Sequence, residues 1–106
     1  VNSEGQTGQT NTNMKLARWV DFSRAGAKDA EGLAMFSHPA NEHPHAWLTR
    51  DYGCLGPRRA EAKSGKPFTL EKGESLETRV GILVHQGDVK SGRVAERYEA
   101  YVGGKL

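Results

Sequence analysis

The 106-residue sequence lacks most of the features that would assign it directly to a functional class. It contains one cysteine, Cys54, which excludes an internal disulfide and any metal site built from several cysteines. It has little excess of either charge, because 15 Lys and Arg residues balance 13 Asp and Glu residues, and its one adjacent basic pair is Arg58 and Arg59. We therefore expect no nucleic-acid partner, since no basic stripe is present to neutralise a run of phosphates.

Long apolar runs are also missing, and none approaches the ~20 residues that a membrane-spanning helix needs. We therefore expect no membrane span. The chain starts at Val1 without the basic and then apolar order of a signal peptide, which predicts a processed, truncated or cleaved chain. Only 36% of the residues are hydrophobic and 13 are glycine, a thin core for one domain of this length. This composition predicts that part of the packing surface is supplied by another polypeptide.

Alternating apolar residues predict a mainly β fold. Residues 14–22 and 32–37 are expected to form a hairpin around a turn at 23–29, residues 47–50 a short strand, and residues 67–70 an extended segment. The clearest alternation covers residues 74–85, where Leu76, Thr78, Val80, Ile82 and Val84 share one face, and it predicts a central strand. We expect a rigid irregular loop at 38–44, which holds two prolines, and a long surface loop at 58–66.

The two ends of the chain differ in pattern. Residues 1–13 are almost entirely polar, which predicts a loop or an extended arm. Residues 88–102 predict an amphipathic helix that is capped by Asp88 and carries an apolar stripe of Val94, Tyr98, Tyr101 and Val102.

Polar side chains are concentrated between residues 38 and 53, on a segment stiffened by Pro39 and Pro44. A His can exchange protons near neutral pH, an Arg can clamp a carboxylate or phosphate, and a Trp offers a flat apolar platform. We therefore predict a site for a polar, ring-bearing ligand. Its candidate residues are His38, Asn41, Trp47, Arg50, Asp51 and Tyr52.

Structural roles compete with the ligand-binding roles. Arg50 and Asp51 are equally well explained by an ion pair that fixes a strand end, and Trp47 by a place in the core. His38, His43 and His45 could hold copper or zinc, but their spacing matches no established metal signature. We predict neither a metal nor a cofactor, and we keep a copper or zinc protein as a less favoured alternative.

Four ordered blocks, WVDFS, GLAMFSHPAN, HPHAWLTRDYG and LEKGESLETRVGILVHQGD, resemble the C-terminal part of a bacterial domain family labelled "methane oxygenase PmoA". The resemblance covers about residues 2–102. The matching positions are His38, Pro39, Asn41, Pro44, Trp47, Arg50, Asp51, Tyr52 and Gly53. Ser37, Ala40 and Leu48 depart from the residues usual in the family, which are Asp, Ser and often His, so catalysis could differ here or be absent.

The resemblance implies an antiparallel β-sandwich of the galactose-mutarotase-like supersandwich type, found in secreted or periplasmic proteins of bacteria that degrade polysaccharides. A whole domain of that type is longer than this chain. Residues 1–106 would then be the C-terminal portion of one larger β-sandwich domain, partnered by an N-terminal portion that is missing or forms a separate chain.

We therefore expect a carbohydrate-active or carbohydrate-binding protein. If it is an enzyme, His38 would exchange a proton with the sugar, Arg50 would hold an oxygen and Asp51 would orient its neighbours. Asn41, Trp47 and Tyr52 would contact the ligand. The main alternative is a non-catalytic structural or binding module.

Overall fold

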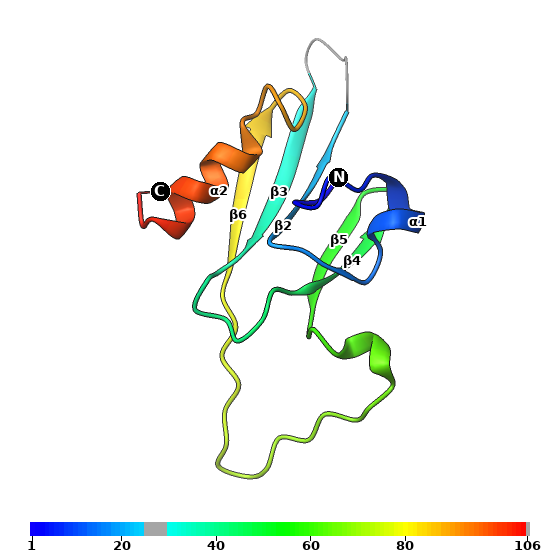
Figure 1. The fold of residues 1–106 in the computed structure, drawn as a ribbon, viewed down its shortest axis with the longest axis vertical. Coiled ribbons are helices and arrows are strands. Elements are labelled where there is room, and N and C mark those ends of the chain that lie inside the picture. Colours follow the sequence, from blue (N-terminus) through cyan, green and yellow to red (C-terminus); the bar gives the residue numbers. More distant parts are fainter. Residues whose placement is uncertain (25–29, 106) are drawn as a thin grey trace.

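The computed structural model describes residues 1–24 and 30–105, and in this part of the chain six strands form two antiparallel sheets (Figure 1). The first sheet has the order β2–β3–β6, formed by Trp19–Ser23, Glu31–Ser37 and Val80–Gln86. The second has the order β1–β4–β5, formed by Lys15–Leu16, Ala46–Arg50 and Cys54–Arg58. The helices are α1 (Gly8–Thr12), the 3-10 turn η1 (Ala62–Ser64) and α2 (Val94–Val102). The predicted mainly β fold with a C-terminal helix is confirmed.

The β2–β3–β6 sheet is covered on both faces. On one face, α2 packs Val94 and Tyr98 against Trp19, Ala34 and Phe36. On the other face, the second sheet packs Trp47 of β4 against Val20 of β2, together with Met35, Leu55 and Val80. Because side chains alternate along a strand, β2 and β3 supply residues to both cores. The arrangement is a small sandwich with a helix on its outer side.

β2 and β3 form the predicted hairpin, in which Trp19 lies opposite Phe36 and Ser23 lies opposite Gly32. The turn predicted at 23–29 falls largely outside the described residues. The strand predicted at 14–22 is divided, because the chain changes sheets at Ala17 and Arg18. Ala17 C=O accepts a hydrogen bond from the Trp47 indole at 2.8 Å, and Arg18 C=O accepts one from Ser37 N–H at 2.8 Å. Alternation alone does not reveal such a crossing between sheets.

The prediction for β6 was wrong in two respects. The strand begins at Val80 rather than at residue 74, and it lies at an edge of its sheet rather than in the centre. The half-buried Leu83 and the buried His85 face the α2 side, whereas Ile82 and Val84 on the opposite face are 65% and 73% exposed. α2 therefore covers the face that carries Leu83 and His85, rather than the more apolar face that carries Ile82 and Val84.

β5 was not predicted, because Gly56 and Pro57 suggested the end of a strand. Pro57 lies opposite Trp47, and β5 is an edge strand, where a residue without an N–H is tolerated.

The N-terminal segment is not a simple arm. Asn2 is 1% exposed, bridges to Val20 and accepts hydrogen bonds from two backbone N–H groups of its own turn, and α1 follows it.

The C-terminal helix starts at Val94 rather than near residue 88. The Asp88 carboxylate instead accepts hydrogen bonds from the N–H groups of Lys90 and Ser91, so it caps a turn that precedes the helix.

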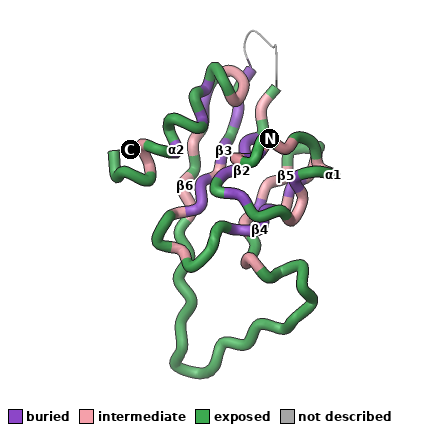
Figure 2. Tube along the Cα trace, viewed as in Figure 1, coloured by how far each residue is buried: buried purple, intermediate pink, exposed green. Residues whose placement is uncertain are grey.

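Residues 61–79 are all exposed and loop away from the sandwich (Figure 2). They contain η1 and the turn at Lys72 and Gly73, but no strand over 67–70. Among the described residues, no helix has the length and apolar character to cross a membrane.

Candidate functional site

Two hollows in the described structure contain residues that the sequence singled out. The larger cavity, of about 640 Å³, lies between α1, the end of β2, the end of β4 and residues 88–90. The smaller cavity, of about 210 Å³, lies beside the loop at 38–44 and the side chain of Tyr98.

The structure divides the predicted site between these two cavities. Arg50 and Asp51 line the larger cavity, whereas His38 and Asn41 line the smaller one. Ser37 lines the smaller cavity, and its Oγ lies 2.9 Å from Nδ1 of His45, the residue that precedes β4. The smaller cavity therefore lies near the start of β4, whereas Arg50 is the last residue of that strand. A strand of five residues spans roughly 16 Å. The three predicted catalytic residues therefore do not meet around one ligand in this structure.

Trp47 and Tyr52 have opposite environments. Trp47 is 0% exposed, and its indole N–H donates to Ala17 C=O, so the core role, one of its two proposed alternatives, is the one observed. Tyr52 is 82% exposed in the β4–β5 turn. Neither residue lines either cavity.

Arg50 and Asp51 hold the N-terminal segment against the end of β4. Arg50 Nη1 donates to Asn13 Oδ1 at 2.8 Å and to Thr49 C=O at 2.9 Å. Asp51 Oδ1 accepts from Gln9 N–H at 2.9 Å, and Asp51 N–H donates back to Gln9 Oε1 at 3.0 Å. The ion pair between Arg50 and Asp51, which was the alternative explanation for these two residues, does not form. Each residue instead binds a different part of residues 9–13, and both still line the cavity.

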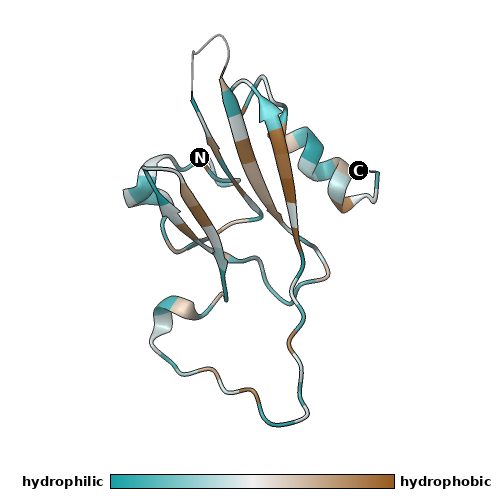
Figure 3. Ribbon diagram, turned by 180° about the vertical axis from the view of Figure 1, so that it is seen from behind, coloured by the Kyte–Doolittle hydropathy of each residue, from teal (hydrophilic) through white to brown (hydrophobic). Residues whose placement is uncertain are grey.

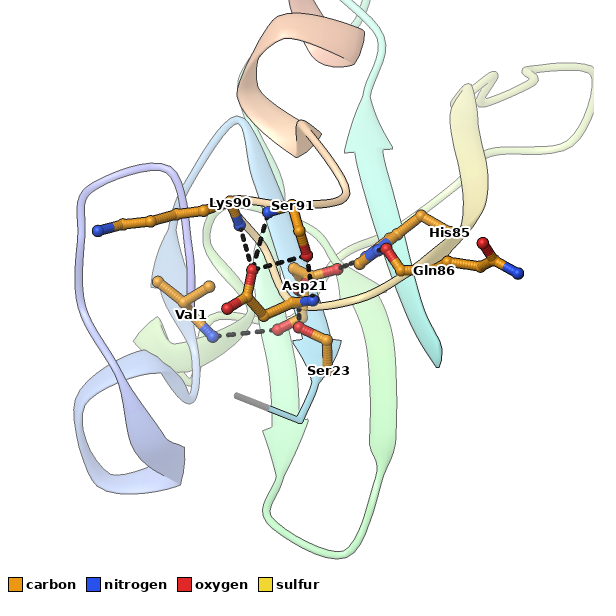
Figure 4. Close-up of polar contacts among 8 residues, drawn as sticks. Val1, Asp21, Ser23, His85, Gln86, Lys90 and Ser91 are labelled. Carbon is orange, nitrogen blue, oxygen red and sulfur yellow. Dashed lines mark hydrogen bonds and ion pairs between the residues drawn. The ribbon is translucent and has the colours of Figure 1, made fainter. Parts of the chain in front are cut away.

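A buried polar cluster in the cavity wall was missed by the sequence analysis (Figure 4). Asp21 Oδ1 of β2 lies 2.5 Å from His85 Nε2 of β6, and the two side chains are 0% and 3% exposed. Ser23 Oγ donates to Asp21 Oδ2 at 2.6 Å, which engages the second carboxylate oxygen. Asp21 and Ser23 line the larger cavity, and His85 lies behind them. The one sequence signal was an acidic residue placed among apolar residues in the WVDFS block.

Two glycines create the space that His85 occupies. A Cβ on Gly32 would lie 2.4 Å from His85 Cε1, and a Cβ on Gly92 would lie 2.2 Å from His85 Nδ1. Atoms cannot approach so closely without displacement, so any larger residue at either position would push the imidazole away from Asp21. The backbone N–H of Gly92 donates to Asp88 C=O at 2.8 Å, so the turn at 88–92 holds this wall in place.

Charged residues of both signs line the larger cavity, including Asp88 and Lys90. Hydrogen bonds from the Ser91 backbone and hydroxyl keep the pKa of Asp88 below its usual value, so this carboxylate is negative at neutral pH. Part of the wall is apolar and includes Val20, Phe22 and Leu55. The cavity therefore offers hydrogen-bonding groups of both kinds beside an apolar surface.

The smaller cavity is shaped by contacts that fix the loop at 38–44. Asn41 Nδ2 donates to Arg79 C=O at 2.8 Å, and Asn41 Oδ1 accepts from Arg79 N–H at 2.9 Å, which ties the loop to the segment before β6. His38 Nδ1 accepts from Ala40 N–H, and its ring forms a T-shaped contact with the ring of Tyr101. The side-chain amide of Asn41 is thus already used in holding the loop.

His45 is buried where the two sheets meet. Its Nδ1 lies 2.9 Å from Ser37 Oγ and its Nε2 lies 2.8 Å from Thr78 Oγ1. Burial lowers the pKa of His45 below its usual 6.5, because the neutral side chain is better accommodated than the charged one. His43, by contrast, is exposed. Within residues 1–24 and 30–105, no group of three His, Cys, Asp or Glu side chains is placed to bind a metal.

This burial predicts a pH-dependent stability. As the pH falls through about 6.5, the unfolded chain protonates His45 before the folded chain does, so the free energy of unfolding should fall. Urea denaturation of the wild type and of His45→Gln between about pH 8 and about pH 5 measures the effect. The variant should lose less stability over that range than the wild type. His43→Gln serves as the control, and equal pH dependence in the wild type and His45→Gln would contradict the prediction.

The chain matches one known protein family. A model of a family of unknown function, DUF6807, matches residues 1–99. The chain belongs to this family. No curated protein and no solved structure matches it significantly. The match confirms one part of the resemblance inferred from sequence, namely that the chain belongs to a family of unknown function. The "methane oxygenase PmoA" label and the mutarotase-like fold stay predictions. The DUF6807 match includes Asp21, Ser23 and His85 as well as the motif residues.

Proposed function

We propose that this DUF6807 chain is part of a carbohydrate-binding β-sandwich protein of the galactose-mutarotase-like supersandwich type, exported to the periplasm or secreted. The observation that supports it best is the larger cavity, in which Arg50, Asp51 and Ser23 lie beside an apolar wall that includes Phe22. Sugars combine hydroxyl groups with apolar ring faces, and a site for them needs hydrogen-bonding side chains beside apolar or aromatic surface.

Binding is favoured over catalysis by the placement of the predicted acid and base. A proton donor must lie within hydrogen-bond reach of the reacting group. His38 lies in the smaller cavity and Arg50 and Asp51 lie in the larger one, so the three-residue mechanism has no common ligand position. We therefore assign the ligand to the larger cavity and give His38 no role in it.

Saccharide titration tests this proposal. We expect methyl glycosides of galactose, glucose or mannose to shift the backbone amide NMR signals around the larger cavity. Asp51→Asn keeps an oxygen for the Gln9 N–H and removes the charge, so it should weaken binding about tenfold or more while the fold is retained. Glu61→Gln, on the exposed segment, is the matched control. Unperturbed cavity signals with all three glycosides would contradict the proposal.

A non-catalytic structural module is the second candidate, and the contacts of the Arg50–Gly53 motif favour it. Arg50 and Asp51 each bind part of the N-terminal segment, and Gly53 takes a φ of +104° that only glycine adopts readily. This candidate predicts that no saccharide binds either the wild type or the Asp51→Asn variant.

We also propose that the N-terminal portion of the same family domain, as a further β-sheet segment, packs on this chain. Leu33, Ile82 and Val84 form an apolar strip on one face of β3 and β6, between 38% and 73% exposed. Figure 3 shows apolar stretches along these strands. The strip continues the face that carries Val20 and Met35, which the second sheet covers, so a larger second sheet would extend the same core.

The mass of the native protein, measured in solution and under denaturing conditions, tests the packing proposal. A second polypeptide that accompanies the 106 residues would support it. A compact, cooperatively folding monomer would overturn it, as would a homodimer in which a second copy covers the strip.

A further inference from the structure

The Ser23–Asp21–His85 cluster has a defined pattern of protons. His85 Nδ1 lies 3.2 Å from Gln86 C=O, and because a carbonyl oxygen can only accept, Nδ1 carries a hydrogen. The 2.5 Å separation of His85 Nε2 from Asp21 Oδ1 requires one further proton between these two atoms. Burial of both side chains makes an unprotonated contact of two lone pairs untenable.

This pattern determines what Ser23 can offer a ligand. A serine hydroxyl has one hydrogen to donate and two lone pairs that accept. The Ser23 hydrogen is donated to Asp21 Oδ2 at 2.6 Å, and Asp21 Oδ1 is held by His85. Ser23 lines the larger cavity, and its Oγ can offer a ligand there only a hydrogen-bond acceptor.

We propose that Ser23 is a ligand-binding residue of the larger cavity, where it accepts a hydrogen bond from a hydroxyl group of a neutral sugar. Asp21 and His85 are positioning residues, which fix the direction of the Ser23 hydroxyl without touching the ligand. The assignment rests on the proposed function and adds to it a binding group outside the Arg50–Gly53 motif.

The rigidity of the cluster supports a built site rather than an incidental contact. His85 lies in a slot formed by Gly32 and Gly92, and both would displace its ring if they carried a Cβ. Ser23 itself is half-buried at the cavity wall, beside Phe22, which is 41% exposed. A pre-oriented acceptor next to an apolar surface binds a hydroxyl without the cost of ordering a side chain.

Amide NMR titration of Ser23 variants with the same methyl glycosides tests the proposal. Ser23→Ala should reduce affinity about fivefold to tenfold, the effect of one lost hydrogen bond. Ser23→Thr keeps the hydroxyl and should restore most of the affinity. Ser64→Ala, at an exposed serine, is the matched control.

The outcomes separate this proposal from the proposed function. Shifts at residues 21–23 in the wild type, lost in Ser23→Ala and restored in Ser23→Thr, would support both. Shifts near Arg50 and Asp51 with equal affinity in Ser23→Ala would overturn the role of Ser23 and leave the carbohydrate site standing. The absence of any shift would overturn both.

Discussion

Replacing His85 with leucine should lower the free energy of unfolding by about 3–5 kcal/mol. The imidazole is the partner of Asp21, a carboxylate that is 0% exposed in the side chain, and leucine cannot hydrogen-bond to it. Removal of one member of a buried pair leaves the other charge without compensation, which costs more than the pair itself contributes. Urea denaturation followed by circular dichroism measures the loss.

Two further variants make this result specific to the pair. Asp21→Asn combined with His85→Leu removes the stranded charge, so the double variant should be more stable than His85→Leu alone. His43→Leu, at an exposed histidine, should change stability by less than about 0.5 kcal/mol. Should His85→Leu lose less than about 1 kcal/mol, or the double variant show no recovery, the pair would not be the buried, coupled unit described above.

Local sequence patterns predicted which residues form strands better than they predicted how the strands are arranged in the two sheets. The β2–β3 hairpin follows from short-range alternation on either side of a turn, and it is confirmed. The division of residues 14–22 between two sheets depends on Trp47, which is distant in sequence, and alternation carries no information about such a partner. The buried face of β6 likewise depends on α2, which covers Leu83 rather than Ile82.

The candidate site, too, was predicted only in part. The Arg50–Gly53 motif was recognised because its residue types are chemically informative, and Arg50 and Asp51 do line a cavity. His38 precedes them by only twelve residues, yet an extended β4 places it at the other end of that strand. Asp21, Ser23 and His85 lie on β2 and β6, far apart in the sequence, so only the folded sheet brings them together.

Replacing Trp47 with alanine should lower the free energy of unfolding by about 3–5 kcal/mol, because it removes the largest fully buried side chain. Trp47 packs against Ala17 and Val20 and so joins β4 of one sheet to β2 of the other. Trp47→Phe keeps most of the apolar volume but loses the hydrogen bond to Ala17 C=O, so its loss should be smaller, about 1–3 kcal/mol.

Tyr52→Ala provides the contrast, because Tyr52 belongs to the same sequence motif but is 82% exposed. Its free energy of unfolding should stay within about 0.5 kcal/mol of the wild type. If Trp47→Ala were equally mild, the indole would not connect the two sheets, and a ligand-binding role for it would regain support. A large loss would assign Trp47 to the core, since a side chain that holds two sheets together with no exposed surface has no face left for a sugar.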